Sequence, residues 1–158
     1  MADREVELKV EAVALDWKGN PIVVLREQEG RRAVFIWVGP TEATSISMHL
    51  EGQKVRRPLA HDLILMVLNS LSAKVDCVVI TDMQEDTYFA DLKLNLHDRE
   101  IALDCRPSDA IAVALRANAP IYIDNGLLER LEESRKESGA ELPASSAPIV
   151  DTGETTVH

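Results

Sequence analysis

Polar side chains gather in four short segments of this sequence, each predicted to lie where a strand ends or a helix begins. The segments are Gly39-Pro40-Thr41-Glu42, residues 56–62, Thr81-Asp82 and residues 104–109. Backbone N–H groups are unpaired at helix starts, and anions bind readily there. The fold alone does not require these polar groups, so the four segments are the candidates for chemistry.

The residue types in these segments suit hydrolysis of a phosphodiester bond. That reaction needs the negative charge of the phosphate neutralised and a water molecule activated. Arg57 and Arg106 could hold the non-bridging oxygens, and His61 could act as the base. The carboxylates that could hold a divalent ion such as magnesium are Asp62, Asp82, Asp104 and Asp109. The sequence therefore predicts a phosphodiester site, provided that these segments converge in the fold.

Most of these residues also have a purely structural interpretation. Asp62 and Asp109 stand near predicted helix starts, where an acid interacts favourably with the helix dipole. Ser108 is a natural cap for its helix, as Thr41 is for the helix after Gly39-Pro40. His61 could bond to the start of its own helix. Each of these residues would then stabilise local structure without taking part in chemistry.

The two arginines differ in whether a structural role accounts for their presence. Arg57 could pair with Glu42 or Glu51, whereas Arg106 follows a predicted strand that does not need an arginine. Asp82 could simply close a strand before a turn. The sequence contains no Walker loop, HExxH, GxSxG or paired CxxC motif, so several standard chemistries lose their usual sequence support.

Hydrophobic periodicity predicts the elements that must position these residues. Strands are predicted at 6–15, 22–26, 33–38, 76–81, 87–96, 101–105 and 121–123, with Trp37 in the core. Helices are predicted at about 41–50, 61–72, 107–117 and 125–136. The first three strands read as an antiparallel meander. Because strands come in hairpin pairs with helices inserted between them, we predict one α+β domain with a mixed or antiparallel sheet.

The predicted helix after His61 and the end of the chain have unusual compositions. The helix, LILMVLNSL, is apolar nearly all round, which indicates that it is buried or covered by a partner. Residues 137–158 are rich in Ser, Pro, Thr, Gly and Glu and have too little apolar content to fold. We therefore expect a domain over residues 1–136 and a flexible acidic tail over residues 137–158.

Composition limits which cellular locations and which binding partners are expected for the protein. The net charge is −10, which is not the footprint of tight nucleic-acid binding unless a local basic patch or a bridging metal ion is present. No apolar stretch approaches the roughly 20 residues of a membrane span. The N-terminus does not read as a secretory signal. Cys77 and Cys105 read as small core residues rather than a disulfide or zinc site, so we expect a cytoplasmic location.

Four ordered segments of the chain resemble the bifunctional nuclease domain family, whose members are described as having DNase and RNase activity. The segments are IWVGPTEATSISMHLEG (36–52), RPLAHDLILMVLNSL (57–71), VVITDMQEDTYFADLKL (78–94) and DCRPSDAIAVALRANAPIYI (104–123). Roughly residues 6–130 are covered. Two departures stand out: Ala60 replaces the usual threonine, and Tyr88-Phe89 reverses the usual order, which moves the phenol to the other face of its strand.

The resemblance implies an α+β fold, a homodimer and nuclease activity on DNA and RNA. No settled catalytic set transfers with it, so we assign roles from motif position and chemistry. The predicted catalytic residues are His61, Asp62, Asp109 and Arg106. The predicted substrate-binding residues are Arg57, Ser108, Arg116, Glu42 and Glu51. Asp82 and Asp109 are the predicted magnesium ligands, and no organic cofactor is expected. The alternative is a non-catalytic dimeric module that binds a small anion, a nucleotide or a protein partner.

Overall fold

The computed structural model describes residues 4–139 as a single α+β domain with one mixed sheet. Its strands are β1 (Glu5–Leu15), β2 (Pro21–Glu27), β3 (Ala33–Trp37), β4 (Ala73–Gln84), β5 (Thr87–Leu96), β6 (Arg99–Cys105) and β7 (Ile121–Asp124). Its helices are α1 (Pro40–Leu50), α2 (Ala60–Ser70), α3 (Pro107–Ala117) and α4 (Asn125–Ser138). The predicted fold class is confirmed, and the predicted elements are present with ends that differ by a few residues.

The sheet consists of two antiparallel halves joined by one short strand. The strand order is β3-β2-β1-β7-β4-β5-β6. The predicted meander forms one half, since β1 pairs antiparallel with β2 and β2 with β3. The other half is the antiparallel series β4-β5-β6. Strand β7 lies between them, antiparallel to β1 and parallel to β4.

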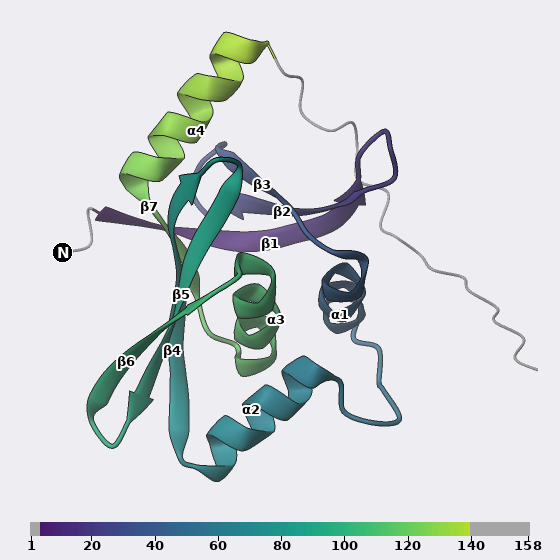
Figure 1. Ribbon diagram of the computed structural model, residues 1–158, viewed down its shortest axis with the longest axis vertical. Helices are drawn as coiled ribbons and strands as arrows, with labels where there is room; N and C mark the ends of the chain where they lie inside the picture. Colours follow the sequence, from purple (N-terminus) through teal and green to yellow (C-terminus); the bar gives the residue numbers. More distant parts are fainter. Residues whose placement is uncertain (1–3, 140–158) are drawn as a thin grey trace, which may run out of the picture.

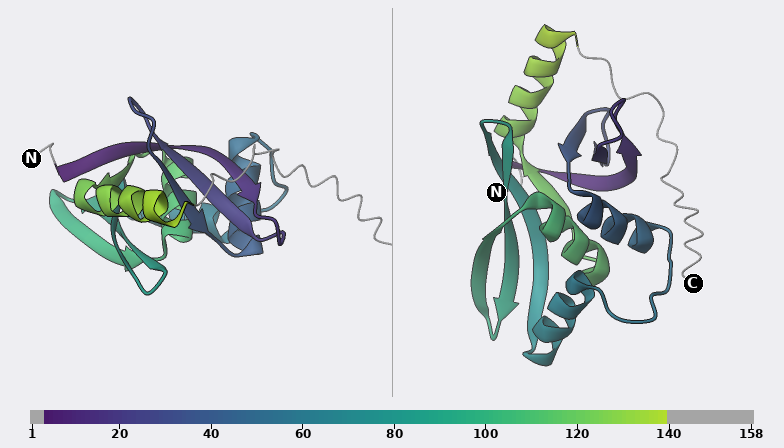
Figure 2. Two further views of the ribbon diagram at one scale, coloured as in Figure 1. Left: turned by 90° about the horizontal axis from the view of Figure 1, so that it is seen from above. Right: turned by 45° about the vertical axis from the view of Figure 1, so that its right-hand side comes forward.

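Three helices lie together in the angle between the two halves of the sheet (Figure 1). Helix α3 packs on β4 and β5 and also contacts both α1 and α2, while α1 rests on β1 and β2. Helix α4 follows β7 directly and lies at the end of the molecule away from α2, as the views in Figure 2 also show. The arrangement brings the three earlier helices into mutual contact, and these helices begin at the predicted polar segments.

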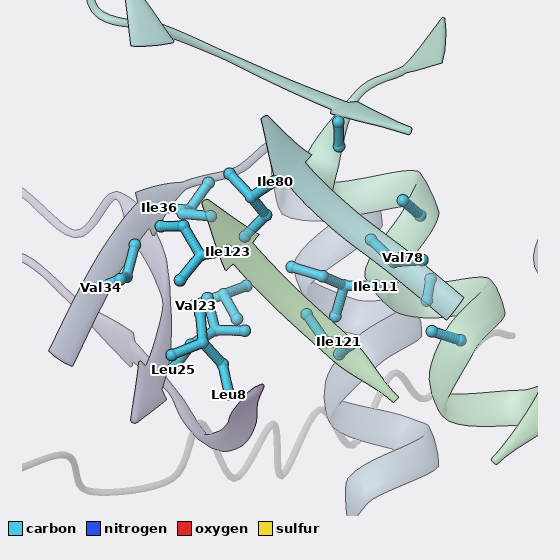
Figure 3. Packing of buried hydrophobic residues seen from close by; sticks show 14 of the residues in the cluster. Leu8, Val23, Leu25, Val34, Ile36, Val78, Ile80, Ile111, Ile121 and Ile123 are labelled. Atoms are coloured by element: carbon cyan, nitrogen blue, oxygen red, sulfur yellow. The ribbon is translucent and has the colours of Figure 1, made fainter. Parts of the chain in front are cut away.

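The core is aliphatic and spans both halves of the sheet. Figure 3 shows Val23 and Ile36 from one half meeting Ile80 from the other around Ile123 of β7, with Ile111 of α3 alongside. All five side chains are buried, so each contributes about 1.5–3 kcal/mol by leaving water. Packing through β7 therefore holds the two halves, and α3 between them, as one body.

Several local predictions are wrong, each for an identifiable reason. Thr81 and Asp82 do not end a strand, because a register shift between Ile80 and Asp82 lets β4 continue to Gln84. Thr41 and Ser108 do not cap helices. Each helix instead begins at the proline before these residues, whose fixed φ suits the first helical position.

Exposure bears on two further expectations and corrects the first. Trp37 is 57% exposed, because it ends the edge strand β3 rather than packing in the core. Helix α2 buries only His61 and leaves much of its apolar surface exposed, as in Leu63 and Val67, so its coverage by a partner stays a prediction. Cys77 and Cys105 are half-buried free thiols. Within residues 4–139, no helix has the length and apolarity that crossing a membrane requires.

The predicted domain boundary at residue 136 falls within α4, which continues to Ser138 and ends at Gly139 in a left-handed conformation. A glycine adopts that conformation without steric cost. The rest of the predicted tail lies outside the described residues.

Candidate functional site

Seven polar side chains form one hydrogen-bonded network where α1, α2 and α3 meet. The polar network contains Glu42 and Ser45 of α1, His61 and Asp62 of α2, Asp109 and Arg116 of α3, and Arg106, which immediately precedes α3. Five of the residues come from three of the predicted polar segments, whereas Ser45 and Arg116 lie outside them. Six of the seven were predicted as site residues, and the structure brings them together.

Arg106 and Asp109 form the exposed end of the polar network. The Arg106 Nε donates to Asp109 Oδ2 at 2.8 Å, and its Nη2 donates to Glu42 Oε1 at 2.9 Å. The second oxygen of Asp109 lies 2.9 Å from His61 Nε2. The Arg106 side chain is 65% exposed, whereas that of Glu42 is largely buried. A guanidinium carries five N–H donors, so Arg106 keeps donors free for an anion that approaches from solvent.

Arg116 forms the buried end of the polar network. Its side chain is only 6% exposed, and its Nε donates to Asp62 Oδ1 at 2.7 Å. Its two terminal nitrogens donate to the carbonyl oxygens of Ala112 and Ser45 and to the Ser45 hydroxyl. The other oxygen of Asp62 accepts the backbone N–H of Leu59 at 2.8 Å, which caps α2. Arg116 thus ties α3 to both other helices.

His61 connects the two ends of the polar network. Because an ionised carboxylate only accepts hydrogen bonds, His61 Nε2 carries the proton that bonds to Asp109. Its Nδ1 then accepts from the Ser45 hydroxyl, at 2.7 Å, while the Ser45 oxygen accepts from Arg116. His61 and Ser45 are both buried. Ser45 therefore cannot reach a substrate as a nucleophile, and its position assigns it to holding the imidazole ring.

Both aspartates of the polar network are strongly biased toward the ionised form. Burial raises the pKa of Asp109, but hydrogen bonds from Arg106 and His61 outweigh burial and hold the pKa below its ordinary value. Burial likewise raises the pKa of Asp62, and the Leu59 N–H and the Arg116 guanidinium lower it further than burial raises it. Arg116 thus compensates Asp62, while Arg106 is shared between Asp109 and Glu42.

These depressed pKa values predict an acid-sensitive fold. The unfolded carboxyls titrate near about 3.9, so their contribution to stability is complete above that pH. It is lost as the pH falls through the lower pKa of the folded state. We expect the urea midpoint of unfolding to decrease as the pH is lowered below about 4. Asp109→Asn should show a shallower decrease, and an equally steep one would contradict the role given to Asp109.

A cleft of about 430 Å³ opens beside the exposed end of the polar network. This α3 cleft is lined by Asn20, Ile36, Trp37, Val38, Gly39, Asp86, Thr87, Tyr88, Arg106, Pro107 and Ser108. Gly39 and Arg106 are the N-cap residues of α1 and α3, and neither helix start is bonded by a capping side chain. The cleft thus brings together two helix starts, whose dipoles favour anions, and an exposed guanidinium that is shared between Asp109 and Glu42.

The remaining predicted site residues are placed elsewhere. Ser108 is buried at the start of α3 and lines the α3 cleft without joining the polar network. Arg57 is exposed in the connector between α1 and α2. Glu51 follows α1 and accepts from Gln53, so it is not the partner of Arg57. Asp104 is exposed on β6. Only the residues at the junction of the three helices converge.

Asp82 lies outside the polar network as well. Its carboxylate accepts from Gln84, from the Met83 N–H and from Arg130 of α4, and these bonds lower its pKa. Among the residues that the structure describes, no group of three His, Cys, Asp or Glu side chains is placed to hold a metal ion. Both oxygens of Asp109 already accept hydrogen bonds. These donor groups therefore do not fit the predicted magnesium site.

The sequence matches a known domain family and several related proteins. Residues 23–136 match the bifunctional nuclease domain. An uncharacterized protein of Mycobacterium tuberculosis is 39% identical over 123 residues, which cover 77% of this chain and 73% of the relative. Bifunctional nuclease 2 of Oryza sativa subsp. japonica is 27% identical over 68% of this chain, and bifunctional nuclease 1 of Arabidopsis thaliana is 25% identical over 71%. The matched parts are 34% and 36% of those two plant proteins. The chain belongs to the bifunctional nuclease domain family.

Proposed function

We propose that this protein is a nuclease that hydrolyses phosphodiester bonds in DNA and RNA. The observation that carries the proposal is the position of Arg106, whose exposed guanidinium bridges Asp109 and Glu42 at the mouth of the α3 cleft. Family membership supports the proposal, as do the names of the plant relatives. Arg106 is the exposed cation of the polar network, and it offers the N–H donors that a phosphate would contact.

The α3 cleft can stabilise the charge that develops on a phosphate during hydrolysis. The free Arg106 donors and the first N–H groups of α1 and α3 would bind the non-bridging oxygens. These donors are held in place before the substrate arrives, since Glu42 and Asp109 fix the guanidinium from two sides. Preorganised donors of this kind commonly supply the largest part of an enzyme's rate enhancement.

Asp109 is the group best placed to accept a proton from the attacking water. It is the carboxylate of the polar network that contacts Arg106 and is partly open to solvent. His61 lies behind it, buried, and acts in this proposal as a positioning residue rather than as the base. Because the pKa of Asp109 is lowered, this carboxylate is a weak base, and charge stabilisation by Arg106 must contribute more to the rate.

The test is cleavage of single-stranded DNA and RNA by the purified protein, with and without EDTA. We expect cleavage, and we expect it to persist in EDTA because no group of three His, Cys, Asp or Glu side chains within residues 4–139 is placed to hold a metal ion. Loss of cleavage in EDTA would instead support the predicted magnesium ion, bound together with the substrate phosphate. A protein that binds oligonucleotides without cutting them would support the non-catalytic alternative and contradict the nuclease proposal.

The exposed surface of α2 supports the expected homodimer. Leu63, Val67 and Leu71 recur at four-residue spacing, so they lie in one row along the helix, and each is about half exposed or more. Apolar rows of this kind are typical of contacts between subunits. We expect a dimer in sedimentation velocity and a monomer for Val67→Asp, with thermal stability of the monomer retained. A monomeric wild-type protein at high concentration would contradict this assignment.

A further inference from the structure

A second cavity, of about 630 Å³, lies on the other side of Trp37 and Tyr88 from the polar network. This aromatic cavity is lined by Leu15, Asp16, Trp17, Ile22, Ala33, Val34, Phe35, Trp37, Tyr88, Leu131, Ser134, Arg135 and Ser138. Aromatic residues are only 4% of the chain, yet both tryptophans, one of two phenylalanines and one of two tyrosines line this space. The aromatic side chains are thus concentrated where the aliphatic core does not need them.

The strand pattern explains how the aromatic cavity forms. In β3, Val34 and Ile36 belong to the main core, so the alternate side chains of Phe35 and Trp37 point to the opposite face of the sheet. Helix α4 supplies the facing wall through residues such as Leu131 and Arg135. The two walls leave between them a volume in the range of small-ligand pockets.

The two tryptophans are exposed, and one is held rigidly. Trp17 is 89% exposed and Trp37 is 57% exposed. The indole Nε1 of Trp37 donates to Asp16 Oδ2 at 3.0 Å, and Asp16 also accepts the N–H groups of Lys18 and Asn20. The hydrogen bond from Trp37, with those from Asn20 and Lys18, lowers the pKa of Asp16 to about 2. An exposed indole with a fixed plane is a ready surface for stacking.

The aromatic cavity adjoins the α3 cleft. Trp37 and Tyr88 line both spaces, and Arg106 lies on the cleft side of them. Tyr88 is held in place as well, since its hydroxyl donates to the Phe35 carbonyl oxygen at 3.4 Å. Burial of this side chain also raises the pKa of its hydroxyl to about 12. Trp37 therefore stands between the α3 cleft, which Arg106 lines, and the aromatic cavity.

Positive charge borders the aromatic cavity. The Lys18 ammonium lies 4.8 Å from the centroid of the Trp17 ring, and the Arg135 guanidinium lies 5.8 Å from the centroid of Phe35. Cations over aromatic faces provide flat, positively charged surfaces beside the space where a base would stack. Acids lie beside these cations as well, since Arg135 pairs with Glu132 and Asp16 lines the cavity, so stacking rather than net charge would hold a base there.

We propose that the aromatic cavity binds an unpaired nucleobase of a single-stranded nucleic acid whose phosphate contacts Arg106. The proposal rests on the nuclease function proposed for the α3 cleft, and it adds a base-binding subsite to it. Stacking on exposed aromatic rings suits any base and needs no particular sequence. A base inside a duplex is already paired with its partner base and stacked between its two neighbours. The subsite therefore selects single strands over duplexes.

The tryptophans themselves provide the measurement. Both line the aromatic cavity and Trp37 also lines the α3 cleft, so intrinsic tryptophan fluorescence of the wild-type protein reports on these two adjoining spaces. We expect quenching by a short single-stranded phosphorothioate oligonucleotide, which resists cleavage, and much less by the same sequence as a duplex. Fluorescence anisotropy of a labelled oligonucleotide should show Trp37→Ala binding about 5- to 100-fold more weakly, the range that one stacked base contributes.

Matched variants separate stacking from structural damage. Trp37→Phe keeps an aromatic face and should bind within a few-fold of wild type. Phe89→Ala removes an exposed aromatic ring of β5 that does not line the aromatic cavity, so its affinity should be unchanged. Equal quenching by single strand and duplex, or unchanged affinity in Trp37→Ala, would overturn the proposal.

Cleavage assayed on the same proteins distinguishes the two proposals. If oligonucleotides quench the fluorescence and Trp37→Ala weakens binding, but no protein cuts, the base-binding subsite stands and the nuclease function fails. If wild type and Trp37→Ala cut single strands with the same KM and no quenching occurs, the nuclease function stands and the subsite is wrong.

Discussion

Arg106→Ala is expected to lower the rate of phosphodiester cleavage by about 100-fold or more while leaving the fold intact. The Arg106 side chain is 65% exposed, and its ion pairs with Asp109 and Glu42 therefore contribute little to stability. Its contribution to catalysis is larger, because in the proposed mechanism it meets the charge that develops on the phosphate. The expected outcome is a protein that folds normally and cuts poorly.

The measurement is kcat/KM on a single-stranded oligonucleotide, with thermal unfolding of the same preparation. Arg130→Ala is the matched control, since Arg130 is 63% exposed and pairs with Asp82 away from the polar network. It should cut like wild type. Cleavage by Arg106→Ala that equals that of wild type would point to a contaminating nuclease or to a different site. Arg106→Lys should recover only part of the rate, because an ammonium cannot bridge two carboxylates in the same planar geometry.

Arg116→Met is expected to have the largest effect on stability, a loss of about 3 kcal/mol or more in the free energy of unfolding. Methionine keeps much of the side-chain volume but removes the charge and every donor. Asp62 then loses its cation, and the acceptors on Ala112 and Ser45 lose their partner in a place where water has little access. All three helices around the site would be loosened together.

Urea denaturation gives the free energy directly, and the midpoint of thermal unfolding should fall by about 10 °C. In a double-mutant cycle, Asp62→Asn combined with Arg116→Met should cost less than the sum of the single changes, because the uncompensated charge is gone. Arg26→Met provides the surface comparison, since Arg26 pairs with Glu11 in solvent and should contribute under about 1 kcal/mol. If Arg116→Met lost no more free energy of unfolding than Arg26→Met, the structural role given to Arg116 would be wrong.

The two arginines of the polar network thus have separate tasks that the sequence does not separate. Both stand at positions of the family pattern, and both were predicted as site residues. Burial distinguishes them: Arg116 is enclosed and holds the helices together, whereas Arg106 is open to the α3 cleft. Burial depends on the packing of α1, α2 and α3, which local sequence does not report.

The elements were predictable because each carries a local signal. Strand β5 alternates apolar and polar side chains over its full length, and its observed bounds, Thr87–Leu96, are those predicted. Asn118 closes α3 in the left-handed conformation that asparagine tolerates. Signals of this kind depend on neighbours in the sequence, so they survive without knowledge of the tertiary structure.

The failures concern relations between distant segments. Ser45 was missed because nothing in the sequence around a serine within a helix indicates that it contacts a histidine of another helix. Trp37 was placed in the core because alternation identifies two faces of a strand but not which of them is covered. Asp82 was grouped with Asp109 by residue type, and the structure separates them. The chemistry of the residues suggested that the polar segments converge. Only the packing of the helices shows that they meet around Asp109.

The order of the strands has a consequence for synthesis of the chain. Strand β7, which joins the two halves of the sheet, follows the other six strands within residues 4–139. A ribosome therefore completes both halves before the strand that unites them. Until β7 emerges, the facing edges of β1 and β4 remain unpaired and open to association with other chains. The nascent protein is most vulnerable to association with other chains just before β7 is made.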